Sequence, residues 1–352
     1  MLVSFVVPVY NSAKHLTDCL ESIRAQTDSD FEVVVVDDGS TDQSTEIVEK
    51  YCKIDKRFKT YKTSNMGPLL ARRIGVENSS GEYILCLDSD DKFRPDTVST
   101  LKKLINMTHP DIINFGMTYN DISWSVDYLT LDKGNYFNEQ YSYIKQCVCG
   151  GESVNVCAKA IKKSLFDLEE DYAPYCGMRY AEDWFQLLPI IDRASSCCCI
   201  DEALYYYRQT PSSSMHTFRL NDLLDFEKCI DRLYSYQNKW GASYQTRCQR
   251  ALIVHTYALL SRSILIGAKK EETEETIALI DRLNMKYSFL NLGGYRENKN
   301  VILAFKRLVL CSAIRKNQHL TYLLIKTHTL VSNIKQIIRR IIDRQKDENG
   351  IC

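Results

Sequence analysis

The sequence predicts an α/β domain, with a mostly parallel sheet flanked by helices, followed by an all-helical C-terminal region. Two patterns indicate this. Over residues 3–116, short apolar runs alternate with segments of helical spacing, which is typical of a sheet built from strand–helix–strand units. Beyond residue 220, only helical spacing remains. We therefore expect two domains, at residues 1–217 and 218–352.

The first strand is expected at residues 3–9, which are nearly all apolar, as in a strand covered on both faces. Apolar residues at helical spacing follow at 16–23, and strands and helices then alternate. The further strands are expected at 31–36, 58–63, 83–87, 111–116 and 197–207, the first four strands being parallel. The further helices are expected around 47–51, at 68–76, 95–107 and 180–193, and then at 223–236, 247–266, 271–283, 301–315 and 320–344.

Composition narrows the possible functions. Lys plus Arg is 45 and Asp plus Glu is 45, so the formal net charge is zero and no global basic field favours nucleic acid. Fourteen Cys residues could indicate disulfides, but they fall mostly in apolar periodic segments without metal-ligand spacing. The N-terminus enters a strand pattern without a basic leader. We therefore expect reduced, buried cysteines and a cytoplasmic location.

Acidic and polar turns follow three of the expected strands. The first strand ends at Pro8-Val9-Tyr10-Asn11, the second at Asp37-Asp38-Gly39-Ser40, and the fourth at Asp88-Ser89-Asp90-Asp91. Parallel strands end at one edge of a sheet, so these carboxylates should lie close together and favour a hard divalent cation such as Mg²⁺ or Mn²⁺. Singly, each turn also fits a solvated loop or a helix cap.

These turns and two further segments together resemble the inverting family 2 glycosyltransferases, which have the GT-A fold. The further segments are Asn65-Met66-Gly67 with Arg72, and Tyr180-Ala181-Glu182-Asp183-Trp184. The resemblance covers about residues 2–215 and rests on five motifs in order.

The resemblance implies a nucleotide-diphosphate sugar donor, most often UDP-linked, at this edge of the sheet. The donor-binding residues that it implies are Pro8, Tyr10, Asn11, Asp38, Gly39, Asn65, Gly67, Arg72, Asp88, Ser89 and Arg208. It also implies that Asp90, with Asp88 beside it, holds Mn²⁺ or Mg²⁺. Asp183 is the implied base that takes the acceptor proton, and Glu182 supports it.

Several of these residues have structural interpretations as well. Arg72 and Arg208 could each form an ion pair, and Glu182 and Asp183 could stabilise a helix start through the macrodipole. Arg73 stands where the family often has Asn, so a helix-start hydrogen bond is lost or a phosphate contact is gained.

The resulting hypothesis is a metal-dependent inverting transfer of sugar to a hydroxyl of a glycan or polyisoprenyl-linked glycan, in surface or extracellular polysaccharide synthesis. The alternative is a catalytically silent nucleotide-sugar-binding subunit of a polysaccharide-synthesis assembly. A sugar nucleotidyltransferase is disfavoured, because residues 10–13 offer no Gly-rich basic loop.

The C-terminal segment is basic and amphipathic. Residues 315–346 carry eight Lys or Arg against one acid, Asp343, a net charge of +7, and apolar residues recur at helical spacing from Leu330 to Ile342. Such a helix either contacts an anionic membrane surface peripherally, on the cytoplasmic face, or packs on its own domain.

Overall fold

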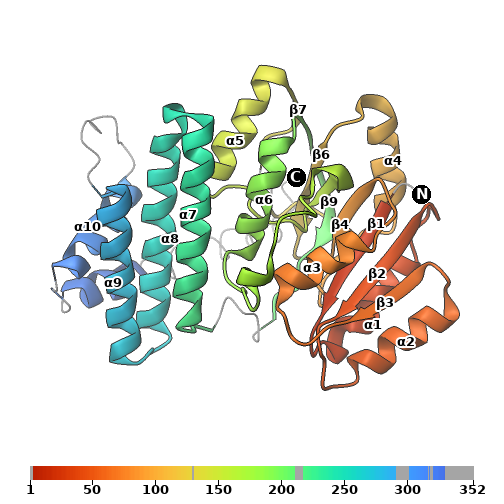
Figure 1. Cartoon of the computed structure of the whole chain (residues 1–352), viewed down its shortest axis with the longest axis horizontal. Helices are drawn as coiled ribbons and strands as arrows, with labels where there is room; N and C mark the ends of the chain where they lie inside the picture. The colour runs from red at the N-terminus through yellow and green to blue at the C-terminus, as the bar shows by residue number, and fades with distance from the viewer. Residues whose placement is uncertain are drawn as a thin grey trace, which may run out of the picture. The chain divides into compact units, whose positions relative to one another are not determined.

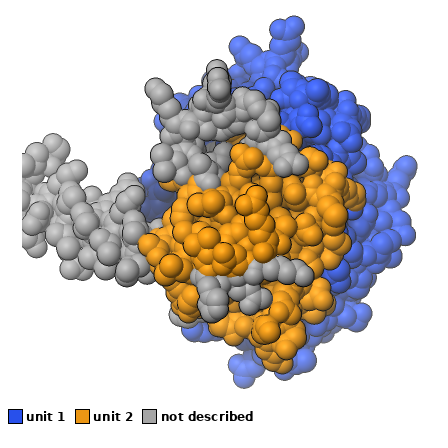
Figure 2. Space-filling model, turned by 90° about the vertical axis from the view of Figure 1, so that its left-hand side faces the viewer, with its two compact units in different colours: residues 1–213, 224–248 blue, residues 214–223, 249–352 orange. Residues whose placement is uncertain are grey.

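The computed structural model describes residues 3–128, 131–210, 217–290, 301–315, 317 and 320–329. The chain divides into two compact units, coloured separately in Figure 2. Unit 1 comprises residues 1–213 and 224–248, and unit 2 comprises residues 214–223 and 249–352. The single boundary expected at residue 217 stays a prediction.

Unit 1 contains a mixed sheet and its covering helices. The strands are β1 (Val3–Val9), β2 (Phe31–Asp37), β3 (Phe58–Lys62), β4 (Tyr83–Cys86), β5 (Lys92–Phe93), β6 (Ile112–Thr118), β7 (Gly134–Phe137), β8 (Lys159–Lys162) and β9 (Ser196–Tyr206). The helices are α1 (Ala13–Arg24), α2 (Ser44–Ile54), α3 (Pro68–Glu77), α4 (Thr97–Thr108), α5 (Ser142–Cys149) and α6 (Glu182–Arg193).

The strands run in the order β3-β2-β1-β4-β8-β6-β9-β5, and β7 pairs with β9. Strands β3, β2, β1 and β4 pair in parallel, as predicted, and Figure 1 shows the first three side by side. Strands β5, β7 and β8 were not predicted from the sequence. Strand β8 lies antiparallel between β4 and β6, so it links the parallel half of the sheet to the rest.

The handedness of the strand–helix–strand connections determines which face of the sheet each of the first helices covers. The strand order proceeds in one direction from β1 to β3 and then reverses to β4, so right-handed crossovers place α1 and α2 on one face and α3 on the other. The contacts agree, because α1 packs against α2, whereas α3 packs on β1 and β2 and against α6. Helix α3 therefore brings its side chains towards the start of α6.

The register of the sheet fixes where the polar turns emerge. Val9 pairs with Asp37 at the ends of β1 and β2, and Val6 pairs with Cys86 at the end of β4. Apart from the buried Ser4 and Glu32 near their amino ends, these strands are apolar and buried, and further polar residues follow at their carboxyl ends. The three turns consequently leave the sheet at the same edge.

The remaining elements are helical, as expected. Helix α7 spans Asn221–Trp240 and α8 spans Gln245–Leu265, and unit 2 continues with α9 (Lys270–Tyr287) and α10 (Val301–Ile314), which pack together. Residues 320–329 are also helical. The basic segment from residue 330 onward lies outside the described residues. Within the described part of the chain, no helix is both long and apolar enough to cross a membrane.

The cysteines behave as predicted from their apolar surroundings. Thirteen of them lie in the described ranges; all thirteen are free thiols, and ten are buried. They contribute to the core as small apolar side chains.

Candidate functional site

Hydrogen bonds join the three turns that the sequence placed at one edge. Asp38 N donates to the carbonyl of Val9 over 2.8 Å, and the Oδ1 of Asn11 accepts a bond from Thr41 N at 2.7 Å. The hydroxyls of Ser12 and Ser89 lie 2.6 Å apart, which connects the end of β1 to the acidic turn after β4. The predicted convergence of these turns is therefore present in the fold.

Asp38 organises the loop that precedes α3. Its buried carboxylate accepts bonds from the Thr63 hydroxyl at 2.6 Å, from Met66 N at 2.6 Å and from Gly67 N at 2.8 Å. Gly67 has a φ of +89°, and a Cβ there would lie 3.0 Å from the carbonyl oxygen of Met178. Only glycine can take this conformation so close to another backbone. The predicted contact of Asp38 with a base or ribose stays a prediction.

Gly39 has the same constraint on the other side of this loop. Its φ is +79°, and a Cβ would lie 3.1 Å from the backbone nitrogen of Asn65. The two glycines thus allow the turn after β2 and the loop before α3 to pack together.

Tyr10, Asn65 and Arg179 form a polar and aromatic wall beside that loop. The guanidinium of Arg179 lies 5.6 Å from the centroid of the half-exposed Tyr10 ring, and it also donates to the Oδ1 of Asn65. Tyr10 and Asn65 were predicted as site residues from the sequence, whereas Arg179 was not. Its position directly before the Tyr180–Trp184 motif was the available signal. An exposed ring beside a cation is a surface on which a flat base can stack.

Arg72 lies between the acidic turn and the start of α6. Its side chain is only 3% exposed, and it donates to Asp88 Oδ1 over 2.8 Å and to Asp183 Oδ1 over 2.6 Å. The Oε1 of Glu182 is 3.6 Å from the same guanidinium. Burial opposes the charge, but Asp183 and Asp88 hold the pKa of Arg72 well above its usual value. The side chain faces these carboxylates, so the implied contact with a base or ribose stays a prediction.

Glu182 and Asp183 begin α6 as predicted. Ala181 precedes them in the left-handed conformation, with a φ of +57°, and the helix N-terminus favours their negative charge. Burial raises the pKa of Asp183, and the charge of Asp88 adds to this, whereas Arg72 lowers the pKa. Burial and the charge of Asp183 raise the pKa of Glu182 to about 8. The pair is thus a set of carboxylates with raised proton affinity beside one buried cation.

One oxygen of Asp183 has hydrogen-bonding capacity to spare. Its Oδ1 faces Arg72, whereas its Oδ2 has a 3.3 Å bond from the backbone nitrogen of Val156. A long bond of this kind leaves lone-pair capacity on Oδ2.

The acidic turn after β4 holds three carboxylates, of which Asp88 pairs with Arg72. Asp91 is buried and accepts bonds from the Tyr205 hydroxyl at 2.5 Å and from Arg208 N at 2.7 Å. Burial and the charges of Asp88 and Asp90 raise the pKa of Asp91 to about 8. The guanidinium of Arg208 donates to the carbonyl of Asp90 at 2.7 Å and to Asp18 at 3.2 Å, so it braces the turn.

Asp90 is the carboxylate of this turn that remains available. Its side chain accepts no hydrogen bond from another residue that the structure describes, and burial together with the charge of Asp88 raises its pKa. Two neighbouring carboxylates with excess negative charge fit a hard divalent cation. Across the described ranges, no group of three or more His, Cys, Asp or Glu side chains could hold a metal ion.

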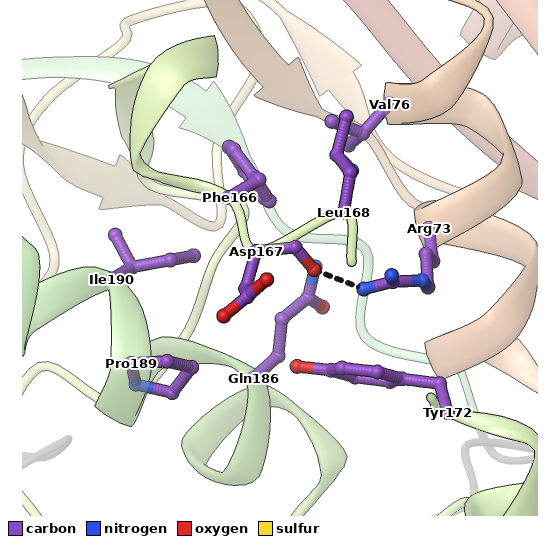
Figure 3. Close-up of a pocket in the computed structure, with 9 residues that line it drawn as sticks. All are labelled: Arg73, Val76, Phe166, Asp167, Leu168, Tyr172, Gln186, Pro189 and Ile190. Atoms are coloured by element: carbon purple, nitrogen blue, oxygen red, sulfur yellow. Dashed lines mark hydrogen bonds between the residues drawn. The ribbon is translucent and has the colours of Figure 1, made fainter. Parts of the chain in front are cut away.

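Arg73 points away from this site. Figure 3 shows it donating to the main-chain oxygen of Asp167, and its guanidinium lies 4.4 Å from the centroid of the Tyr172 ring. The pocket drawn there, between α3 and α6, is lined mainly by apolar side chains of the domain and contains none of the predicted site residues. Arg73 contacts a backbone carbonyl here, so the structure gives no support to a phosphate contact.

Comparison with known proteins shows which family the first part of the chain matches. The family model described as glycosyl transferase family 2 matches residues 4–166. Residues 4–166 belong to glycosyl transferase family 2. This family 2 segment contains the turns after β1, β2 and β4 together with Arg72, and the match confirms the predicted family.

Related proteins align with this chain over only part of their own lengths. The chain is 32% identical over 187 residues to the protein named glycosyltransferase EpsH of Bacillus subtilis, covering 52% of this chain and 54% of EpsH. It is 39% identical over 116 residues to the poly(ribitol-phosphate) β-N-acetylglucosaminyltransferase TarS of Staphylococcus aureus, covering 32% of this chain and 20% of TarS. The chain thus spans about half of EpsH and one fifth of TarS.

Solved structures confirm the predicted fold. The crystal structure of S. aureus TarS residues 1–349 in complex with UDP-GlcNAc superposes with a TM-score of 0.67 at 21% identity, covering 94% of this chain and 92% of that one. A mannosyltransferase from Pyrobaculum calidifontis, in complex with GDP-Man and Mn²⁺, gives a TM-score of 0.52 at 14% identity, covering 90% and 86% of the two chains. The fold of this chain is therefore GT-A, with a helical C-terminal region.

Proposed function

We propose that the protein is a metal-dependent inverting glycosyltransferase that transfers a sugar from a UDP-linked donor to a hydroxyl of a glycan or lipid-linked glycan. The observation that carries this proposal is Arg72, which joins the acidic turn of Asp88 to the carboxylate of Asp183 within one buried network. A donor held at the turn and an acceptor beside α6 would thus meet. The similarity of the fold to TarS, whose crystal structure is a complex with UDP-GlcNAc, supports a UDP-linked donor.

Each residue has a defined task in this proposal. Tyr10, Asn65 and Arg179 would contact the base, and Asp38 and Gly67 maintain the loop that carries Asn65. Asp90, with Asp88, would hold a divalent cation. When bound, such a cation neutralises negative charge on the departing diphosphate.

Asp183 would act as the base. The acceptor hydroxyl gives its proton to Asp183 Oδ2, and its oxygen forms a bond to the anomeric carbon from the face opposite the diphosphate. The bond from that carbon to the diphosphate oxygen breaks, and UDP leaves with the electron pair. A single displacement of this kind inverts the anomeric configuration. The raised proton affinity of Asp183 suits the role, because a general base works best when its pKa approaches the working pH.

The test measures donor binding and turnover separately. UDP-sugars with Mn²⁺ should raise the melting temperature of the wild type, and UDP release with glycan acceptors should follow. Asp183→Asn should retain donor binding and lose at least about a hundredfold in turnover, because general-base catalysis contributes that much or more. Asp90→Asn should lose the Mn²⁺-dependent part of binding.

A matched control is Asp201→Asn. Asp201 lies on β9, and the substitution removes an exposed carboxylate that pairs with Lys133. It should behave as the wild type. Normal turnover in Asp183→Asn would contradict the proposed base, and donor binding without any transfer by the wild type would favour the silent binding subunit instead.

The cellular setting remains a prediction. A role in surface or extracellular polysaccharide synthesis and a polyisoprenyl-linked acceptor are compatible with the proposed reaction. A cytoplasmic location and peripheral membrane contact of the basic segment stay predictions from the sequence, with packing of that segment on its own domain as the alternative. Most of the basic segment, residues 315–346, lies outside the described ranges.

A further inference from the structure

An exposed apolar loop follows strand β6. Residues 119–128, which we name the aromatic loop, contain two tyrosines, Tyr119 and Tyr128, together with Ile122, Trp124 and Val126. Tyr119 is 47% exposed and Ile122 is 90% exposed, and Val126 and Tyr128 are exposed as well. Large apolar side chains that cluster on a surface indicate a binding site more often than isolated ones do.

The aromatic loop has an ordered backbone. Its base closes where Met117 and Tyr128 pair as an antiparallel bridge, and the carboxylate of Asp127 accepts a bond from Tyr119 N at 2.7 Å. Near its tip, Trp124 N donates to the carbonyl of Asn120, and Trp124 has a φ of +49°. A bulky residue in the left-handed region is strained, and such strain is concentrated at functional sites.

One side of the aromatic loop adjoins the acidic turn. Asp121 forms a 2.7 Å ion pair with Lys92, which is two residues after Asp90. The ring of Tyr119 also packs edge-on against Tyr207, with centroids 6.2 Å apart, and Tyr207 directly precedes the Arg208 that braces the turn. These contacts fix the loop beside the predicted diphosphate position.

The other side of the loop adjoins the proposed base. Met117, at the base of the loop, accepts a 3.3 Å contact from the side-chain nitrogen of Asn155. The next residue, Val156, donates from its backbone nitrogen to Asp183 Oδ2. The base of the aromatic loop is therefore connected to Asp183 through Asn155 and Val156. Its other side is connected to the acidic turn through Lys92, and the proposed transfer needs its acceptor near both groups.

We propose that the aromatic loop, together with Tyr207, binds the acceptor as a neutral glycan by stacking on its sugar rings. This inference rests on the proposed function. Tyrosine rings offer faces for the apolar C–H side of a sugar, and Asp121 and Asp127 add acceptors for hydroxyl groups. Within residues 119–128 the charged side chains are these two aspartates, and Lys92 already pairs with Asp121, so the loop itself contributes no cation that would favour an anionic acceptor.

The experiment measures glycan binding without a donor. Tryptophan fluorescence of the full chain is titrated with a panel of neutral probes: the methyl and 4-nitrophenyl glycosides of glucose, galactose, mannose and their N-acetylated forms, and short oligosaccharides of each. We expect at least one probe to change the fluorescence in a Trp124-dependent manner, so that Trp124→Phe removes the response. Tyr119→Ala should weaken binding of that probe about tenfold, whereas Tyr119→Phe should bind as the wild type.

A control variant and the donor readout make the outcome decisive. Tyr322→Ala removes a tyrosine of similar exposure, 52%, from unit 2 and should leave glycan binding unchanged. No Trp124-dependent response to any probe, or equal affinity in Tyr119→Ala, would overturn the acceptor site. So would concentration-dependent self-association that Tyr119→Ala abolishes. Failure of the proposed function appears separately, as absent binding of every UDP-sugar with Mn²⁺.

Discussion

Replacing Arg72 by Gln tests the electrostatics of the site most directly. The substitution removes a guanidinium that contacts Asp88 at 2.8 Å and Asp183 at 2.6 Å, and it leaves the neighbouring carboxylates without this cation. A glutamine can still donate one hydrogen bond, but it has no charge. The change therefore isolates the effect of the buried positive charge.

The size of the effect follows from burial and distance. A pair of unit charges about 4 Å apart gains about 4 kcal/mol at an effective dielectric constant of about 20. Asp183 is 25% exposed, so its ion pair with Arg72 comes near this energy. Asp88 is 37% exposed, so solvent largely screens its pair with Arg72, which contributes about 1 kcal/mol or less. Breaking a buried pair costs about 3–5 kcal/mol. Because Asp183 can take up a proton, we expect the lower end, about 3 kcal/mol.

The pH dependence gives the sharper readout. Burial already raises the pKa of Asp183, so the folded protein holds a proton that the unfolded chain has released above the usual carboxyl range. This part of the stability falls as pH rises. Without Arg72 the pKa of Asp183 rises further, so the free energy of unfolding should fall more steeply with pH in Arg72→Gln than in the wild type.

Urea unfolding at pH 5.5, 7 and 8.5 would measure this difference. Arg94→Gln is the control, since Arg94 pairs on the surface with the exposed carboxylates of Asp96 and Glu202. It should lose about 1 kcal/mol or less with little pH dependence. Equal losses in the two variants, or an Arg72→Gln loss that does not grow with pH, would refute the argument.

Two further predictions concern the loop before α3 and the far end of the sheet. Gly67→Ala should lose more than the roughly 1–2 kcal/mol expected from its φ alone and weaken UDP binding, because its Cβ would contact the Met178 carbonyl. Gly267→Ala, with a similar φ and open space, should lose only the φ contribution, as denaturant unfolding would show. Burial opposes ionisation of Glu32, but hydrogen bonds from four donor groups lower its pKa to about 2. Its contribution is present above pH 4.5 and is lost as pH falls towards 2, so Glu32→Gln should be less stable by about 2–3 kcal/mol at pH 6 and nearly equal near pH 2. Glu49→Gln, an exposed pair, should show no such difference.

The sequence predicted the parts of the site that local patterns determine. Apolar runs located β1, β2 and β4, and the parallel arrangement then required their terminal turns to meet. Strand β8 was missed, because Lys159–Lys162 is short and polar at both ends and pairs only with strands distant in sequence. Helical spacing placed Arg72 on α3, but tertiary packing alone determines that it reaches Asp88 and Asp183.

The same reasoning explains Arg179 and the aromatic loop. An arginine in an irregular segment has no periodicity to reveal its partner, and its contact with Tyr10 depends on how the loop before α6 docks on the loop before α3. Likewise, an exposed tyrosine such as Tyr119 has no signature in the sequence until its neighbours are known.

Helix α7 has a consequence for any shortened form of the protein. Asp225, on α7, accepts bonds from the backbone nitrogens of Arg179 and Tyr180, and Arg232 pairs with Glu170 in the same unit. A polypeptide cut at residue 217 would keep Asp88, Asp90 and Asp183. It would lose Asp225 and Arg232, and with Asp225 the two hydrogen bonds that hold the segment leading into Glu182. Unit 1 is thus a discontinuous piece of sequence, and a fragment that preserves the proposed nucleotide site would have to extend through residue 248.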